Sequence, residues 1–225
     1  MQQLSRVIDH TLLKSEATLS QIAKLCEEAQ QHFFYAVCVN SRWVPESVRR
    51  LKTDQPEKKI HVCAVVGFPL GAMATEMKAA ETAWCVQQGA DEIDMVISIG
   101  DLKDKNNQLV QQDIASVVQA AQGKVVKVIL ETHLLTEQEK IQACLLAKQA
   151  GAHFVKTSTG FTGGGATLDD VRLMKNTVGD SMQVKASGGV RDTSTALKML
   201  EAGATRLGTS SGVSLVLGQK SQGGY

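Results

Sequence analysis

The stretch Gly89-Ala90-Asp91-Glu92-Ile93-Asp94-Met95-Val96-Ile97 contains the signal that decides the fold. Its glycine and alanine follow an amphipathic helical segment, and a short apolar run begins directly after them. Glycine readily adopts the left-handed backbone conformation found just past helix ends, so the dipeptide marks a helix-to-strand junction. The same junction recurs at Gly151-Ala152 and at Gly203-Ala204. This repetition predicts that helices and strands alternate along the chain.

Short apolar runs with near-uniform spacing predict eight strands. They lie at residues 7–10, 35–40, 60–67, 92–98, 125–131, 154–158, 183–187 and 205–208. Helical periodicity is found between them, at residues 75–88, 136–150, 167–178 and 193–202, and Thr136 with Glu139 has the signature of a capping box. An open doubly wound sheet fits this alternation too. The number and spacing of the strands favour an α/β fold of another kind, a single (β/α)8 TIM barrel, for which ~250 residues is typical.

Composition narrows the class of protein and its partners. The chain has 225 residues, 43% hydrophobic and 21% charged, with a formal net charge of +1, which gives no reason to expect nucleic acid or a membrane surface as a partner. No apolar run reaches the ~20 residues of a membrane span, and the first residues lack the apolar stretch of a signal peptide. We expect one domain, residues 1–225, in which residues 218–225 form a mobile polar tail.

The cysteines and histidines indicate the compartment and argue against a metal centre. The five cysteines are scattered and include no Cys-x-x-Cys pair, and the five histidines are equally dispersed. This pattern is typical of reduced thiols in a cytoplasmic protein rather than of disulfides or a zinc site. We therefore expect a cytoplasmic protein without a metal or other cofactor.

Two lysines lie inside predicted strands. Lys156 is in the run Phe154-Val155-Lys156-Thr157-Ser158, and Lys185 is in Gln183-Val184-Lys185-Ala186-Ser187. A buried ammonium group is rarely tolerated unless it is paired or loses its proton. On the fourth predicted strand, Asp94 has the apolar neighbours Ile93 and Met95. Active sites of such barrels form at the carboxyl ends of the strands, so inward-facing side chains would bring both lysines and Asp94 together.

The expected chemistry of this trio follows from its charges. Two nearby cations disfavour each other and burial acts in the same direction, so one lysine is expected to have a pKa below the ordinary value of ~10.4. A neutral amine can attack an aldehyde or ketone to form a Schiff base, and the protonated iminium is an electron sink for breaking or making a carbon–carbon bond. The charged lysine and Asp94 would then move protons. The alternative is that Asp94 neutralises a buried lysine for structural reasons alone.

Glycines after the last two predicted strands suggest a second function. Gly188-Gly189 follows the seventh strand, and Gly208-Thr209-Ser210-Ser211-Gly212 follows the eighth. In these barrels the loops after strands seven and eight often hold a phosphate, and hydroxyls of Ser210 or Ser211 could add donors. Tight turns that need glycine are the alternative interpretation. Residues 159–165, rich in glycine, could complete the cradle or act as a flexible lid.

The segments around these residues resemble the deoxyribose-phosphate aldolases of the shorter bacterial type, nearly from end to end. The resemblance rests on the segments Ile8-Asp9-His10-Thr11-Leu12-Leu13, Val37-Cys38-Val39-Asn40, Gly67-Phe68-Pro69-Leu70-Gly71, Ala90-Asp91-Glu92-Ile93-Asp94-Met95-Val96-Ile97, Val155-Lys156-Thr157-Ser158-Thr159-Gly160-Phe161, Lys185-Ala186-Ser187-Gly188-Gly189-Val190-Arg191 and Gly208-Thr209-Ser210-Ser211. It implies a (β/α)8 barrel that reversibly splits 2-deoxy-D-ribose 5-phosphate into acetaldehyde and glyceraldehyde 3-phosphate, without a cofactor. We also expect a homo-oligomer, a dimer or a tetramer, because barrels of this size commonly self-associate.

The resemblance also implies roles for individual residues. Lys156 would form the Schiff base, Lys185 would perturb it, and Asp94 with Lys185 would relay protons. Thr11 would lie near the sugar end, and Tyr225 matches a C-terminal tyrosine thought to assist proton transfer, although an ordinary chain terminus is an equal alternative. Near the phosphate the resemblance places Gly160, Gly188, Gly189, Ser210 and Ser211.

Two other functions remain open at the level of sequence. In a phosphate-binding barrel isomerase or synthase, the lysines would only bind an anionic substrate. A catalytically silent phosphosugar-binding or regulatory protein would be expected to lack one of the lysines or the aspartate, and all three residues are present.

Overall fold

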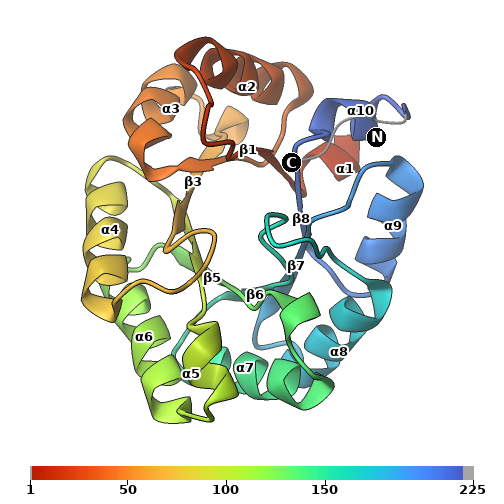
Figure 1. Cartoon of the computed structure of the whole chain (residues 1–225). Helices are drawn as coiled ribbons and strands as arrows, with labels where there is room; N and C mark the ends of the chain where they lie inside the picture. The colour runs from red at the N-terminus through yellow and green to blue at the C-terminus, as the bar shows by residue number, and fades with distance from the viewer. Residues whose placement is uncertain (1, 220–225) are drawn as a thin grey trace.

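A closed barrel of parallel strands forms the centre of the protein (Figure 1). The computed structural model describes residues 2–219, and within them eight strands pair in sequence order, with the last returning to the first. The strands are β1 (Ile8–Leu12), β2 (Ala36–Asn40), β3 (His61–Val66), β4 (Glu92–Val96), β5 (Val125–Ile129), β6 (Phe154–Lys156), β7 (Gln183–Ser187) and β8 (Arg206–Thr209). The prediction of an α/β fold with (β/α)8 barrel architecture is therefore confirmed.

Helices form a ring around this barrel (Figure 1). The α-helices are α1 (Gln2–Ser5), α2 (Leu19–His32), α3 (Val44–Leu51), α4 (Thr75–Gln87), α5 (Ile99–Lys103), α6 (Asn107–Ala120), α7 (Glu137–Gln149), α8 (Leu168–Val178), α9 (Thr193–Glu201) and α10 (Gly212–Val216). Short 3-10 helices lie at Ser41–Trp43, Pro56–Lys58 and Thr132–Leu134. Within residues 2–219, none of the helices combines the length and the apolar character needed to cross a membrane.

The glycine-alanine junctions are built as the sequence predicts. Gly89, Gly151 and Gly203 have φ angles of 98°, 82° and 112°, in the left-handed region that favours glycine. The alanine after each of them is buried where the next strand begins. The capping box is also present, because the backbone N–H of Thr136 donates to Glu139 Oε2 at 2.7 Å and the backbone N–H of Glu139 donates to Thr136 Oγ1 at 3.3 Å.

The hydrophobic core lies between the outer face of the barrel and the helices. Strand residues such as Ile93, Val155 and Val184 belong to the same buried cluster as Ile114 of α6 and Met174 of α8. Side chains alternate along a strand, so the residues between these apolar positions point into the barrel. The interior holds charged residues of the strands together with a small apolar cluster that includes Cys38, Cys63 and Val65.

Candidate active site

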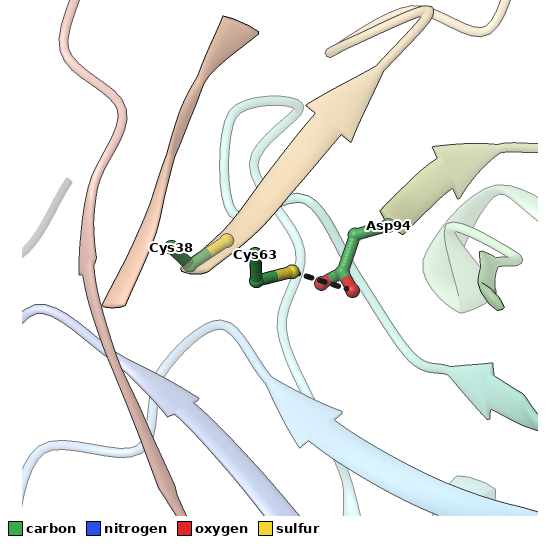
Figure 2. A group of neighbouring side chains, drawn as sticks. All are labelled: Cys38, Cys63 and Asp94. Carbon is green, nitrogen blue, oxygen red and sulfur yellow. Dashed lines mark hydrogen bonds between the residues drawn. The ribbon is translucent and has the colours of Figure 1, made fainter. Parts of the chain in front are cut away.

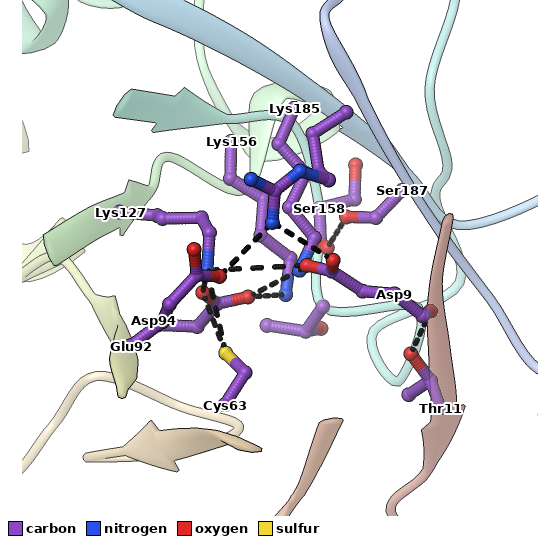
Figure 3. A network of polar contacts seen from close by, with 12 residues as sticks. Asp9, Thr11, Cys63, Glu92, Asp94, Lys127, Lys156, Ser158, Lys185 and Ser187 are labelled. Atoms are coloured by element: carbon purple, nitrogen blue, oxygen red, sulfur yellow. Dashed lines mark hydrogen bonds and ion pairs between the residues drawn. The ribbon is translucent and has the colours of Figure 1, made fainter. Parts of the chain in front are cut away.

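The structure brings Lys156, Lys185 and Asp94 together inside the barrel (Figure 3). Lys156 on β6 and Lys185 on β7 are direct partners in the strand register. Each donates from Nζ to Oδ2 of Asp94 at 2.8 Å. Asp94 and Lys185 are fully buried, and Lys156 keeps 3% of its surface exposed. The convergence of the two amines and one acid, expected from the alternation of side chains, is therefore present.

Four further charged residues complete this network, and the sequence analysis did not place them in the site. Lys127 Nζ lies 2.7 Å from Asp94 Oδ1 and 2.6 Å from Glu92 Oε2. Arg206 Nη1 lies 3.0 Å from Glu92 Oε2 and 3.0 Å from Asp9 Oδ1, and the other oxygen of Asp9 accepts from Lys185. The signal for them was available, since all four are charged residues within or at the start of predicted strands.

These contacts fix the charge of the network. Burial disfavours ionisation of Asp94, but the charges of Lys127, Lys156 and Lys185 outweigh it and hold the pKa of Asp94 well below its ordinary value. Burial also disfavours the ammonium group of Lys185, yet Asp9 and Asp94 raise the pKa of Lys185 above its ordinary value. Lys185 is therefore a permanent cation beside Lys156. The division of roles between the two lysines stays a prediction.

The strand register separates the three lysines by depth. Lys127 pairs with Asp94, whereas Ile129, two residues further along β5, pairs with Lys156. Lys127 therefore lies one inward-facing layer below Lys156, further from the carboxyl ends of the strands. Lys127 and Lys185 have no exposed surface and each contacts two or more carboxylates, while Lys156 has one ion-pair partner, Asp94, within residues 2–219. Of the three amines, Lys156 belongs to the residue with the most exposed surface.

Two cysteines lie near the same carboxylate (Figure 2). Cys38 and Cys63 are paired in the register of β2 and β3, and their sulfur atoms lie within 4.8 Å of each other and of an Asp94 oxygen. A cation in this position would face the ammonium groups of Lys127, Lys156 and Lys185, which already occupy both oxygens of Asp94. The charges therefore favour the observed thiol contact, in which Cys63 donates to Asp94 Oδ1 at 3.1 Å, over a bound metal.

Two of the three glycines predicted to hold phosphate, Gly160 and Gly189, line a cavity at the carboxyl ends of β6 and β7. A cavity of about 480 Å³ is lined by Gly160, Gly189, Arg191 and residues 163–165, and a narrower one beside it is lined by Gly189, Arg191 and residues 208–211. Gly188 has a φ of 82°, and a Cβ there would lie 3.0 Å from the Cα of Gly165. Ser210 and Ser211 line the narrower cavity, which shares Gly189 and Arg191 with the larger one. The sequence analysis missed Arg191, which is common to both cavities.

Thr11, one of the two remaining predicted residues, lines a different cavity. The Thr11 hydroxyl donates to the backbone oxygen of Asp9 at 2.8 Å, and Thr11 lines a separate cavity of about 320 Å³ that also reaches Ser210. Tyr225 and most of the predicted tail lie outside the described residues, which end at Gln219.

Comparison with known proteins identifies the family. The family model for DeoC/LacD family aldolases matches residues 4–218. The chain belongs to this aldolase family. Among its DeoC/LacD relatives, the deoxyribose-phosphate aldolase of Bdellovibrio bacteriovorus is 59% identical over 99% of this chain and 100% of the relative. That of Halalkalibacterium halodurans is 57% identical over 99% of this chain and 98% of the relative.

A solved DeoC/LacD structure has the same architecture. The tetrameric deoxyribose phosphate aldolase from Aeropyrum pernix superposes with a TM-score of 0.88 at 30% identity, covering 96% of this chain and 91% of that one. The family resemblance inferred from the sequence segments is therefore confirmed over nearly the whole chain.

Proposed function

We propose that this protein is a class I aldolase that reversibly cleaves 2-deoxy-D-ribose 5-phosphate into acetaldehyde and D-glyceraldehyde 3-phosphate, a step of deoxyribonucleoside catabolism. The observation that carries the proposal is the shared oxygen of Asp94, which accepts from both Lys156 and Lys185 at 2.8 Å. The names of the closely similar relatives support the substrate. The reaction is a carbon–carbon lyase reaction that uses no metal.

Lys156 is the proposed nucleophile. Its neutral amine attacks the C1 aldehyde of the open-chain sugar, and loss of water from the carbinolamine gives an iminium ion. The C2–C3 bond then breaks as the C3 hydroxyl loses its proton, and the electron pair of the bond passes into the iminium to form an enamine. Protonation of the enamine at C2 and hydrolysis release acetaldehyde and restore the amine.

Asp94 and Lys185 are the proposed proton relay. Asp94 is ionised and contacts Lys156 directly, so it can exchange protons with the groups that form on that nitrogen, through water where the distance requires it. Lys185 is a permanent cation that donates to the same Asp94 oxygen as Lys156, so it holds the relay carboxylate beside the reacting amine. Below them, Lys127 and Arg206 balance the buried carboxylates and keep Asp94 in place.

The glycine-rich cavities are the proposed phosphate site. Gly160, Gly188 and Gly189 carry backbone N–H groups and no side chain of their own, and Gly160, Gly189, Ser210, Ser211 and Arg191 line the two cavities. Thr11 at the sugar end and Tyr225 in proton transfer remain parts of the proposal.

Two measurements test the proposal together. Retro-aldol turnover of deoxyribose 5-phosphate is followed by coupled detection of glyceraldehyde 3-phosphate. Borohydride reduction in the presence of acetaldehyde, followed by peptide mass analysis, locates the covalent adduct, which we expect on Lys156. Lys78 is the internal control, because it is equally buried but ion-paired to Asp113 at 2.6 Å, away from the site. Turnover without an adduct on Lys156 would show that another residue is the nucleophile. Binding of the sugar phosphate without turnover would favour a silent phosphosugar-binding protein.

Self-association and location complete the proposal. The relative from Aeropyrum pernix is tetrameric, and α4 with the residues before it exposes Met73, Met77 and Trp84, side chains that are common at subunit contacts. Light scattering of the purified protein and of Trp84→Glu tests whether this chain forms a homo-oligomer through that face. Five free, buried cysteines suit a reducing, cytoplasmic environment.

A further inference from the structure

Ser158 carries a buried hydroxyl that the folded chain leaves unpaired. The residue has no exposed surface, and its Oγ has no hydrogen-bond partner within the described part of the chain. Buried hydroxyls are normally satisfied, because an unmade hydrogen bond destabilises the folded state. Thr132, after β5, has a second unpaired hydroxyl at the strand ends, but only Ser158 follows the strand that carries Lys156.

The hydroxyls around Ser158 are all used by the fold. Ser187 Oγ donates to the backbone oxygen of Ser158 at 2.6 Å, and Thr157 Oγ1 donates to the backbone oxygen of Ser187 at 2.9 Å. The Thr159 hydroxyl donates to Glu131. The backbone of Ser158 is thus fixed on both sides while its own side chain has no structural task.

Ser158 follows Lys156 by two residues and lies next to the glycine turn beside the proposed phosphate cavities. It stands two residues beyond Lys156, so both side chains point to the same face of the extended segment. Its Cβ lies 3.4 Å from the position that a Cβ on Gly188 would take, and Gly188 opens the turn that lines the phosphate cavities. Figure 3 shows Ser158 beside Ser187, next to the network of Lys156, Lys185 and Asp94.

The substrate has two hydroxyl-bearing carbons, C3 and C4, between the carbon that bonds to Lys156 and the phosphate. When C1 is bonded to Lys156 and the C5 phosphate lies among the glycines, C3 and C4 lie between them. The C3 oxygen loses its proton in the reaction and belongs with the relay of Asp94 and Lys185. The C4 hydroxyl, nearer the phosphate, takes no part in the chemistry and needs a partner when water is excluded.

We propose that Ser158 is a specificity-determining residue whose hydroxyl binds the C4 hydroxyl of the sugar, which is the 2-hydroxyl of glyceraldehyde 3-phosphate. The inference rests on the proposed function and deepens it, because it assigns selection of the acceptor aldehyde to one side chain. A site that hydrogen-bonds a substrate hydroxyl discriminates against an analogue that lacks it, since its own polar group is then left buried and unpaired.

The test compares two acceptors in Ser158→Ala and the wild type. Acetaldehyde addition is measured with D-glyceraldehyde 3-phosphate and with 3-phosphooxypropanal, which lacks only the 2-hydroxyl. We expect kcat/KM for glyceraldehyde 3-phosphate to fall about tenfold in the variant, the factor of one hydrogen bond, with little change for the analogue. The ligand-free variant should also have a higher Tm, because an unpaired buried hydroxyl has been removed. Ser47→Ala, a buried serine on α3, is the control and should leave the preference unchanged.

The outcomes separate the inference from the proposed function. Equal loss for both acceptors, or no loss for either, would overturn the role of Ser158 while leaving the aldolase intact. A lower Tm with an unchanged preference would show that the hydroxyl is structural and would also overturn it. Wild-type protein inactive with both aldehydes would overturn the proposed function itself, and this inference with it.

Discussion

Lys156 and Lys185 occupy directly paired positions on neighbouring parallel strands. Like charges directly opposite each other on a sheet destabilise it, and here both are also shielded from water. The arrangement persists because Asp94 Oδ2 accepts a hydrogen bond from each ammonium group, and because Asp9 gives Lys185 a further partner. A pairing that the fold must compensate in this way indicates a function for the lysines beyond packing.

Replacing the two lysines should separate their roles. We expect Lys156→Leu to abolish turnover and adduct formation, because the nucleophile is gone. Lys185→Leu should lower kcat about 10²–10⁴-fold, because the permanent cation that holds Asp94 and serves the relay is removed. Circular dichroism checks that both variants fold. Near-native rates for Lys185→Leu at neutral pH would contradict the electrostatic role of that lysine.

Lys127 should contribute strongly to the stability of the folded protein. Lys127→Met removes one of the two cations that contact Glu92 and the cation that contacts Asp94 Oδ1, so we expect the free energy of unfolding to fall by about 3–5 kcal/mol. Urea unfolding measures the change. The double variant Lys127→Met/Glu92→Gln should recover part of the loss. Lys24→Met, whose side chain is 74% exposed, is the matched control and should change stability little.

Acid should weaken the fold through Asp9. Burial raises the pKa of Asp9, but the charges of Lys185, Arg206 and Lys127 outweigh it and lower the value to about 2 from 3.8. A folded-state pKa below the unfolded one contributes stability that is fully present above pH 3.8 and is lost as the pH falls through 2. The contribution is on the order of 2 kcal/mol.

Urea unfolding between pH 5 and pH 2 measures this loss. Asp9→Asn should be less stable at pH 5 and should show a shallower dependence on pH. Asp169→Asn, at a side chain that is 95% exposed, should retain the wild-type slope. A wild-type unfolding midpoint that stays constant down to pH 2 would contradict the link to the buried network.

Arg191 should contribute to phosphate affinity. We expect Arg191→Gln to raise KM for deoxyribose 5-phosphate about tenfold with little change in kcat, because a charge-assisted hydrogen bond to the phosphate is lost. Turnover of unphosphorylated deoxyribose provides the comparison and should not change. Arg172→Gln on α8 serves as a control for surface charge. An equal effect on both sugars would place Arg191 outside the phosphate site.

The alternation of helices and strands was predictable because its signals are local. Glycine-alanine junctions and capping residues act within a few positions, and the strands at residues 92–96, 154–156 and 183–187 fall inside the predicted runs. Asp94, Lys156 and Lys185 were also found, because a charge flanked by apolar residues stands out in any strand.

The wider network was not predicted because it depends on the stagger of strands far apart in sequence. Glu92 has the same strand parity as Asp94, and Lys127 lies in an apolar run as Lys156 does. Nothing local reveals that Arg206, on the last strand, reaches Asp9 on the first and Glu92 on the fourth. These contacts follow from closure of the barrel, which sets the depth of each side chain.

The interlocked charges at the base of the barrel have a practical consequence for anyone who wishes to alter the reaction. The residues of this base share ion-pair partners; they are Lys127, Glu92, Arg206 and Asp9. Replacement of one of them leaves its buried partners unpaired, so the variant loses stability before any new activity can be selected. Mutant libraries aimed at new aldehydes should therefore leave this base untouched and concentrate on the loops at the rim, where a substitution alters the shape of the entrance without unbalancing the ions beneath it.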